Sequence, residues 1–246
     1  GARILQCQYE FKEISDDYKA DLILGNNVLA HVPDINDFVS GLQYVLKPNG
    51  VVTFEFPHLL ELIKHTQFDT IYHEHYSYLS LLFIHKLFEK HNLKVFDVEQ
   101  LNTHGGSLRV YAKHKNCQIH PQSEKSLQIL DLELKYGLEK MSTYGNFQIL
   151  TEKLKDNFVE FLINTKKNNK KVVGYGAAAK GNTFINFSGI KKDLISYVVD
   201  KSDFKQGKFL PGSHIPVKSE EYIKIDKPDV VVILPWNLKD EIISQL

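Results

Sequence analysis

The stretch Asp21-Leu-Ile-Leu-Gly-Asn-Asn27 decides the fold of the first half of this chain. A short apolar run that ends in Gly and Asn is typical of a buried parallel strand that delivers a polar loop at its carboxyl end. A helical pattern follows over residues 35–46, then a predicted turn at Lys47-Pro-Asn-Gly50 and a second buried strand at Val51–Phe56. Strand, helix and strand in this order predict a parallel crossover unit and an α/β fold.

The segments on either side extend this unit. Residues 1–19 suggest a short strand and a turn. Beyond the second strand, Ser80 is placed to cap a helix over residues 81–91, and strands are expected at Leu93–Val98 and Leu108–Ala112. Residues 121–166 carry helical periodicity with few breakers, so we expect one or two connecting helices there.

A second α/β unit begins at Val172. Its signals are a strand with a glycine-bearing turn, a strand at Leu194–Val199 and a buried strand at Asp229–Leu234. We therefore expect three segments: an α/β domain over 1–115, a helical connector over 116–168, and a second, Rossmann-like α/β domain over 169–246.

Composition excludes several classes of function. The 246 residues are 43% apolar and 24% charged, with 30 basic and 30 acidic side chains, so no overall field favours nucleic acid or an anionic membrane. No apolar run reaches the length of a membrane span, and no signal peptide is evident. Cys7 and Cys117 match no zinc spacing, which predicts reduced cysteines in a cytoplasmic protein. The start at Gly1 and the end inside a helical pattern suggest a fragment.

The most chemically suggestive stretch is Phe68-Asp-Thr-Ile-Tyr-His-Glu-His-Tyr-Ser-Tyr-Leu-Ser80. Imidazole, carboxylate and phenol groups this close together favour proton-transfer chemistry, although they are also compatible with aromatic core residues and surface histidines. A zinc protease motif needs two histidines four apart, whereas His73 and His75 are two apart. We therefore prefer general base catalysis and expect no metal here.

Two further places carry candidate ligand contacts. Gly174-Tyr-Gly176 supplies only two of the three glycines of a dinucleotide fingerprint, so a nucleotide diphosphate fits this turn as well as NAD does. Lys180 adds a positive charge and Asp200 lies where such folds bind a ribose hydroxyl, although the glycines also suit plain strand-to-helix packing. In the first domain, Asn27 and His31 follow a strand's carboxyl end, where α/β sheets bind ligands.

Five motifs, in order along nearly the whole chain, resemble the S-adenosylmethionine (SAM)-dependent sugar C-methyltransferases: Asn27-Val-Leu-Ala-His-Val-Pro-Asp34, Leu46-Lys-Pro-Asn-Gly50, Phe68 to Tyr78, His104-Gly-Gly-Ser-Leu-Arg109 and Gly174 to Thr183. These enzymes add a methyl group to carbon 3 of a nucleotide-linked 4-keto-6-deoxy sugar. The resemblance implies a partial SAM-methyltransferase sheet, a helical connector and a Rossmann-like domain for the nucleotide sugar.

The family also has an amino-terminal zinc-binding domain and a glycine-rich SAM loop on its first strand. Neither is found in this sequence, so zinc is expected only in the missing part and the SAM site is expected to be incomplete. The implied substrate is a nucleotide-linked sugar, with thymidine diphosphate as the family's nucleotide. The sugar, its stereochemistry and the oligomeric state are not readable from the sequence.

The resemblance also assigns roles to single residues. His75 becomes the base that removes the carbon 3 proton, with Tyr72 and Glu74 shaping the sugar pocket, and His73 remains an alternative base. His31 steadies the sugar or the enolate, and Asn27 contacts the cofactor. The remaining implied contacts are to the nucleotide sugar, from Gly176, Lys180, Asn182 and Tyr78.

Two competing functions remain. One is a nucleotide-sugar-binding fragment without turnover, since half of the SAM site is missing; SAM binding discriminates it from an active enzyme. The other is an NAD-dependent oxidoreductase built on the Gly174 turn. It needs the absent third glycine and explains none of the residues from Tyr72 to His75.

Overall fold

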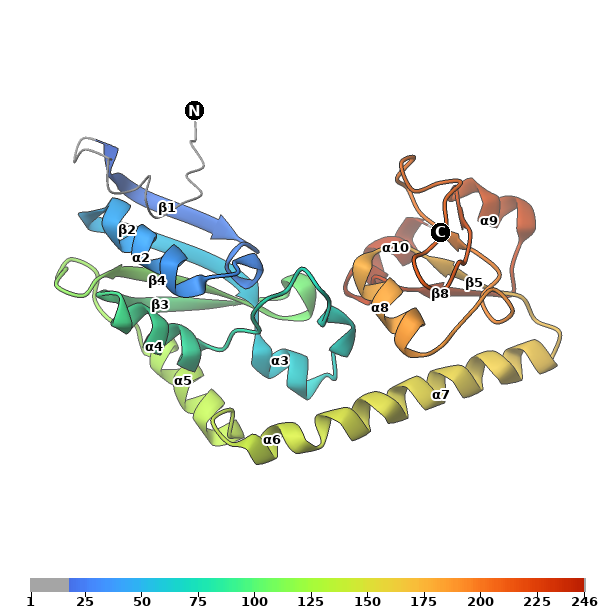
Figure 1. Cartoon of the computed structure of the whole chain (residues 1–246), viewed down its shortest axis with the longest axis horizontal. Coiled ribbons are helices and arrows are strands. Elements are labelled where there is room, and N and C mark those ends of the chain that lie inside the picture. Colours follow the sequence, from blue (N-terminus) through green and yellow to red (C-terminus); the bar gives the residue numbers. More distant parts are fainter. Residues whose placement is uncertain (1–17, 246) are drawn as a thin grey trace. The chain divides into compact units, whose positions relative to one another are not determined.

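The computed structural model describes residues 18–245 and divides the chain into two units (Figure 1). The first unit comprises Gly1–His65 and Glu74–Gly145, and the second comprises Thr66–His73 and Asn146–Leu246. The short segment Thr66–His73 is thus separated from its sequence neighbours and grouped with the carboxyl-terminal half of the chain. The expected strand and turn of residues 1–19 lie almost wholly outside the described residues, as does Cys7.

The first unit contains a four-stranded sheet in the order β1-β2-β4-β3. Its strands are β1 (Ala20–Asn26), β2 (Leu46–Pro57), β3 (Leu93–Leu101) and β4 (Ser107–His114). As predicted, β1 and β2 are parallel, and β4 runs antiparallel to both of its neighbours. This confirms the α/β fold of the first half.

The predicted turn at residues 47–50 is wrong, because these residues lie inside β2. Ala20 pairs with Leu46, but Leu22 already pairs with Val51, so residues 47–50 form an irregularity opposite a single residue of β1. A Cβ atom on Gly50 would lie 2.9 Å from the Ala20 carbonyl oxygen, so glycine permits the close approach of the two strands. The Pro-Asn-Gly signal therefore marks a bulge rather than a chain reversal.

Side-chain caps begin helices α2 and α4 of the first unit. Asp34 accepts from the Asp37 amide at the start of α2 (Ile35–Val45). Ser80, as predicted, accepts from the Phe83 amide at the start of α4 (Leu81–Lys90). The other helical segments are η2 (Leu29–His31), α3 (Leu59–Lys64), η4 (Thr103–Gly105), α5 (Glu124–Tyr136) and α6 (Met141–Gly145). Gly137 ends α5 in the left-handed conformation, with φ 88°.

The sheet of the first unit has one apolar and one polar face. Phe54 and Phe56 of β2 and Val110 of β4 point into a core shared with α2 and α4. The alternating residues Glu55 and Arg109 lie on the opposite face and form an ion pair at 2.8 Å. The period of two along the strands thus separates packing from polar chemistry.

A buried acid joins α5 to α4 within this unit. The Glu133 side chain has no solvent exposure and accepts hydrogen bonds from the amides of Leu81 and Leu82, at 2.7 and 2.8 Å. It also bonds the imidazole of His58 at 2.7 Å. The carboxylate therefore completes the amino terminus of α4, which begins where the histidine-rich stretch ends.

The second unit contains a parallel sheet in the order β7-β6-β5-β8. Its strands are β5 (Val172–Tyr175), β6 (Val198–Val199), β7 (Val217–Lys218) and β8 (Val230–Ile233), and its helical segments are η3 (Phe68–Thr70), α7 (Phe147–Lys167), α8 (Ala179–Phe187), α9 (Glu221–Asp226), η5 (Trp236–Leu238) and α10 (Lys239–Gln245). The expected strand over residues 194–199 shrinks to its last two residues. The amides of Leu194 and Ile195 instead bond the Lys191 carbonyl in a local turn.

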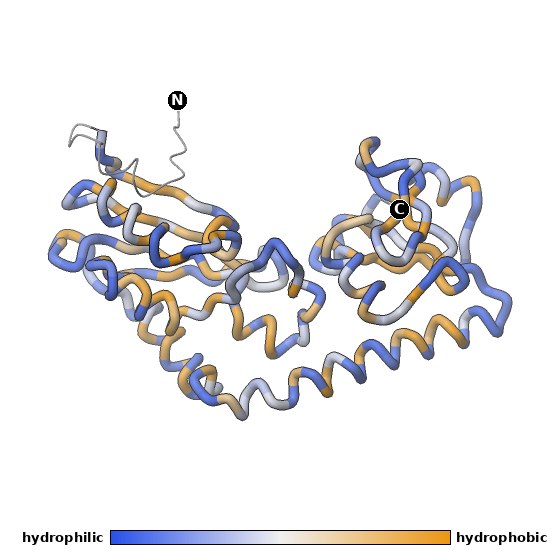
Figure 2. The backbone as a smooth tube through the Cα atoms, in the orientation of Figure 1, coloured by the Kyte–Doolittle hydropathy of each residue, from blue (hydrophilic) through white to orange (hydrophobic). Residues whose placement is uncertain are grey.

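Both faces of the second sheet are covered, as parallel sheets require. Val172 and Val198 pack with Ile185 of α8 and Leu162 of α7, whereas Val173 packs on the other face with α10. Along α7, apolar and polar residues alternate at helical spacing (Figure 2).

The predicted connector, residues 116–168, contains three helices rather than one or two. Of these, α5 and α6 belong to the first unit and α7 to the second. Cys117 is a free, buried thiol. Among the described residues, no helix is long and apolar enough to cross a membrane.

Candidate functional site

The histidine-rich stretch is divided between the two units. Tyr72 and His73 belong to the second unit, with ring centroids 6.5 Å apart. Glu74 and the residues after it belong to the first unit, where the amides of Tyr76 and Ser77 both bond the Ala30 carbonyl. The second half of the stretch is thus fixed to η2, directly after strand β1.

These contacts bring His31 and His75 together. Their ring centroids are 4.8 Å apart in an edge-to-face arrangement, and the Tyr78 ring lies 6.1 Å from His75. The Nδ1 atom of His31 lies 2.8 Å from the carbonyl oxygen of Glu74, so Nδ1 carries the proton and donates. In neutral His31 the Nε2 atom is therefore a hydrogen-bond acceptor.

Asn27 lies at the carboxyl end of β1 in the left-handed conformation, with φ 55°. Its amide nitrogen is 2.8 Å from Nε2 of His104, a residue that also has φ 55°. Two residues other than glycine in this conformation are a local strain of the kind that gathers at functional sites. The Oδ1 atom of Asn27 is buried, and no partner for it exists among the described residues.

The polar face of the sheet is organised around Glu55. Its two carboxylate oxygens accept from the Thr103 hydroxyl and from Arg109, each at 2.8 Å. Burial raises the pKa of Glu55, but these two hydrogen bonds outweigh it and hold the pKa below its ordinary value. Because Thr103 begins η4, the ionised carboxylate fixes the loop that carries His104.

In the second unit, Gly176 and Asp200 lie at the carboxyl ends of β5 and β6. Gly176 has φ 91°, and a Cβ atom there would lie 2.5 Å from the Pro235 ring, so only glycine fits. The Asp200 carboxylate accepts from the amides of Ala177 and Ser202 and from Lys205. Asp200, the predicted ribose contact, thus already accepts hydrogen bonds from loops of the second unit.

A crevice of about 230 Å³ adjoins these strand ends and is lined by Gly176, Asp200, Pro235 and residues of α10. This is the edge at which α/β sheets bind ligands. The volume is below the roughly 300–1,000 Å³ of typical small-molecule sites, so the crevice is too small to enclose a whole ligand of that size.

Lys180 and Asn182 both lie on α8. The Lys180 ammonium lies 5.1 Å from the centre of the Trp236 ring and 3.5 Å from the Asn237 side-chain oxygen. Burial lowers the pKa of Lys180, opposed by the charge of Asp69. The Oδ1 atom of Asn182 is buried without a partner in the described part of the chain.

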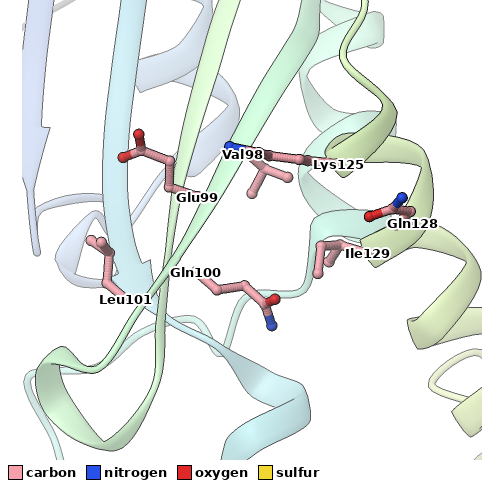
Figure 3. A pocket seen from close by; sticks show the side chains of 7 residues that line it. All are labelled: Val98, Glu99, Gln100, Leu101, Lys125, Gln128 and Ile129. Carbon is pink, nitrogen blue, oxygen red and sulfur yellow. The ribbon is translucent and has the colours of Figure 1, made fainter.

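A larger cavity of about 550 Å³ lies between β3 and α5 (Figure 3). Its polar lining includes Glu99, Lys125 and Gln128, but none of the predicted site residues. Glu99 is already bonded to Tyr111 at 3.0 Å. Within residues 18–245, no cluster of three or more His, Cys, Asp or Glu side chains suits a metal ion.

Sequence reasoning did not assign roles to His104, Trp236 or Glu133. His104 stood in a recognised motif, and its position before two glycines was a usable signal. Trp236 is the one tryptophan of the chain. Glu133 looked like an ordinary acid in an amphipathic helix, because its burial depends on helices distant in sequence.

Comparison with known proteins identifies the family of the chain. A methyltransferase domain model matches residues 4–98, and the C-methyltransferase C-terminal domain model matches residues 102–246. The chain belongs to the C-methyltransferase family. It is 38% identical over 225 residues to the C-methyltransferase NovU of Streptomyces niveus, across 92% of this chain but only 53% of that protein.

Likenesses to solved structures are partial. Magnesium protoporphyrin IX methyltransferase from Synechocystis PCC 6803, with bound SAH, is 16% identical with a TM-score of 0.32, covering 42% of this chain and 47% of that one. An O-methyltransferase family protein from Burkholderia thailandensis is 12% identical with a TM-score of 0.32, covering 44% and 33%. Likenesses this weak carry no argument about function.

Proposed function

We propose that the chain forms part of a SAM-dependent C-methyltransferase that acts at carbon 3 of a nucleotide-linked 4-keto-6-deoxy sugar. Family membership supports the reaction class. The observation that carries the mechanism is the His31–His75 pair, 4.8 Å apart at the carboxyl end of β1. Methylation of carbon next to a ketone needs a base, and imidazole is suited to that task near neutral pH.

His75 is the base of this mechanism. The carbon 4 ketone acidifies the proton on carbon 3, and the imidazole of His75 accepts that proton as the C–H bond breaks. The electron pair passes into the carbonyl as an enolate. Phenol groups stabilise such an oxyanion by hydrogen bonding, and the 6.1 Å between the ring centroids of Tyr78 and His75 supports this role for Tyr78. Tyr72 and Glu74 shape the sugar pocket.

His31 orients the base and contacts the sugar. Because its Nδ1–H is bonded to the Glu74 carbonyl, its Nε2 atom can accept a hydrogen bond from a sugar hydroxyl. The same bond holds the backbone next to His75. His31 therefore has two proposed roles: it holds the backbone beside His75, and it contacts the sugar.

Asn27 is the residue of this chain proposed to contact SAM. Its buried Oδ1 atom lacks a partner in residues 18–245, and a buried acceptor of this kind fits a donor such as the SAM ammonium group. SAM would supply an electrophilic methyl group for carbon 3. His104, through its 2.8 Å contact, would hold the Asn27 amide in place.

The second unit is proposed to bind the nucleotide part of the substrate, with thymidine diphosphate as the expected nucleotide. Two observations support this role: the Oδ1 atom of Asn182 has no hydrogen-bond partner among the described residues, and a crevice lies beside Gly176. The Lys180 ammonium lies over the Trp236 ring. We propose that it contacts the diphosphate from this position.

Replacement of His75 by alanine in the complete protein tests the mechanism. We expect turnover to fall by about 10²–10⁴-fold, the contribution of a general base, with SAH binding unchanged by calorimetry. His73→Ala is the matched control on the neighbouring histidine. Full turnover in His75→Ala would contradict the assignment, and loss in His73→Ala alone would move the base to His73.

A second titration separates an active enzyme from a binding fragment. This chain is titrated with SAH and, separately, with thymidine diphosphate. Binding of both supports a functional cofactor site in these residues. Nucleotide binding without SAH binding would favour a nucleotide-sugar-binding fragment that lacks turnover.

A further inference from the structure

The histidine-rich stretch is preceded by a segment that belongs to the second unit. Residues Thr66–His73, including η3, are grouped with the carboxyl-terminal half, whereas Glu74 onward lies in the first unit. The chain thus enters the proposed catalytic stretch from one unit and leaves it in the other. Whatever fixes η3 in the second unit also fixes the start of this stretch.

Aromatic packing supplies the first anchor of η3. Phe68 is 6% exposed, and its ring lies 5.5 Å from Phe184 and 5.0 Å from Phe187, both on α8. Phe184 in turn contacts Phe158 of α7, at 4.9 Å. This packing is non-directional, so it holds the segment in place without fixing the orientation of the residues that follow.

Asp69 supplies a directional anchor. Asp69 is 5% exposed, and its Oδ2 atom accepts a hydrogen bond from the Trp236 indole nitrogen at 2.7 Å. Burial raises the pKa of Asp69, opposed by the Trp236 hydrogen bond and by the charge of Lys180. A buried carboxylate without a hydrogen-bond donor is energetically costly, because nothing replaces its lost hydration. The hydrogen bond from Trp236 therefore favours one position of the Asp69 side chain.

Lys180 completes the cluster from above the indole. Its ammonium lies 5.1 Å from the centre of the Trp236 ring, within the range of a cation–π interaction. One tryptophan therefore contacts the acid through its N–H edge and the cation through its face. A phenylalanine at position 236 keeps an aromatic face for Lys180 but has no N–H group to donate to Asp69. The two contacts can therefore be separated by experiment.

We infer that Trp236 is a positioning residue for methyl transfer: through Asp69 it fixes the start of the stretch Tyr72–Tyr78 and thereby Tyr72 and His73, which belong to the same unit. The inference rests on the proposed function, because it assumes that Tyr72 contacts the sugar. Trp236 touches neither substrate nor cofactor in this role. Its action passes along the chain within the second unit, from Asp69 to Tyr72 and His73.

The test compares Trp236→Phe with Tyr197→Phe. Both substitutions keep an aromatic ring and remove one hydrogen bond to a carboxylate, since the Tyr197 hydroxyl donates to Asp226 at 2.8 Å in the same unit. Turnover is measured in the complete protein, and amide hydrogen exchange over residues 66–78 is measured in this chain. We expect Trp236→Phe to raise exchange there and to lower kcat by about tenfold to a hundredfold with little change in SAM KM. Tyr197→Phe should do neither.

A double-mutant cycle shows whether Trp236 acts through Asp69. Asp69→Leu removes the acceptor, and the double variant should lose no more kcat than either single variant, because both remove the same contact. Asp69→Asn keeps an acceptor oxygen for the indole and should retain most of the kcat. Additive losses in the double variant would overturn the inference.

The outcomes separate this inference from the proposed function. Unchanged exchange over residues 66–78 in Trp236→Phe overturns the positioning role, whatever His75 does. Equal losses of kcat in Trp236→Phe and Tyr197→Phe would mean general destabilisation and would also overturn it. If His75→Ala keeps full turnover while Trp236→Phe raises exchange, the proposed function fails, and the positioning role for the reaction fails with it.

Discussion

The carboxyl ends of the two sheets differ in what their polar side chains do. In the first unit, Asn27 follows β1 and keeps a buried oxygen without a partner, beside the imidazole of His104. In the second unit, Asp200 follows β6 and already accepts from two amides and a lysine of its own loops. In residues 18–245, one strand end has a buried acceptor that makes no hydrogen bond, and the other uses its acceptors to hold the fold.

The comparison shows that a polar residue after a parallel strand is a good site candidate only if the protein itself leaves some of its hydrogen-bonding atoms without a partner. The sequence pattern is the same in both units. What separates them is the surrounding loops: the Ala177 amide after β5 and the Ser202 amide after β6 both donate to Asp200, whereas no described residue donates to the Asn27 oxygen.

The largest expected effect comes from a buried acid in the first unit that serves the fold alone. Glu133→Ala leaves two amides of α4 and the His58 imidazole without their acceptor. We expect a loss of about 3–5 kcal/mol in the free energy of unfolding, the size seen when a buried charge network is broken. Urea denaturation checks this.

Asp131→Ala is the matched control for Glu133, on the same helix. Asp131 forms an exposed i, i+4 ion pair with Lys135, worth at most about 0.5 kcal/mol. Equal losses in the two variants would show that the burial of Glu133 contributes nothing.

The next prediction tests the structural role of Asp200. Asp200→Ala should lower the free energy of unfolding by about 1–3 kcal/mol, because the Ala177 and Ser202 amides lose their acceptor. Asp203→Ala, an exposed acid three residues on, should change it little. If Asp200→Ala instead weakened thymidine diphosphate binding without loss of stability, the contrast between the two strand ends would collapse.

A smaller effect is expected at the opposite strand end. His104→Asn tolerates the left-handed backbone but cannot hold the Asn27 amide at the same distance. SAH affinity should fall by about five- to tenfold, the size of one hydrogen bond, as measured by calorimetry. His214→Asn, at an exposed histidine with φ 57° in the second unit, should leave the affinity unchanged.

The smallest effect concerns pH. The pKa of Asp69 is raised by burial, so its contribution to stability is present below the ordinary aspartate pKa of about 3.9 and is lost as pH rises through the raised folded-state pKa. Trp236, the chain's one tryptophan, donates to this carboxyl, so its fluorescence should change with a midpoint above that ordinary pKa. Asp69→Asn should abolish the transition. A transition that survives in Asp69→Asn would assign it to another group.

Sequence reasoning was most successful where one physical signal dominates. Apolar runs located β1, β2, β5 and β8, and the Ser80 cap located α4, because burial and capping are local properties of a few residues. The Pro-Asn-Gly stretch was misread because its geometry depends on the pairing of β2 with β1. Leu194 and Ile195 were misread because a buried turn and a buried strand have the same apolar composition.

The candidate site was only partly readable for the same reason. The motif around His75 indicated the chemistry, but the pairing of His31 with His75 depends on two loops 44 positions apart that meet at Ala30. The bond between Asp69 and Trp236 joins residues 167 positions apart, and no local pattern marks it. The roles assigned to all of the candidate site residues, His75 and Asn27 included, remain predictions.

The strand β1 has a practical consequence for anyone who purifies this chain. Among residues 18–245 it lies at the edge of its sheet, and Leu22 and Leu24, which are 54% and 69% exposed, alternate with the core-facing Ile23. An apolar edge strand is a template for intermolecular pairing. Concentrated samples should therefore self-associate, and Leu24→Lys should raise the concentration at which light scattering first detects aggregates.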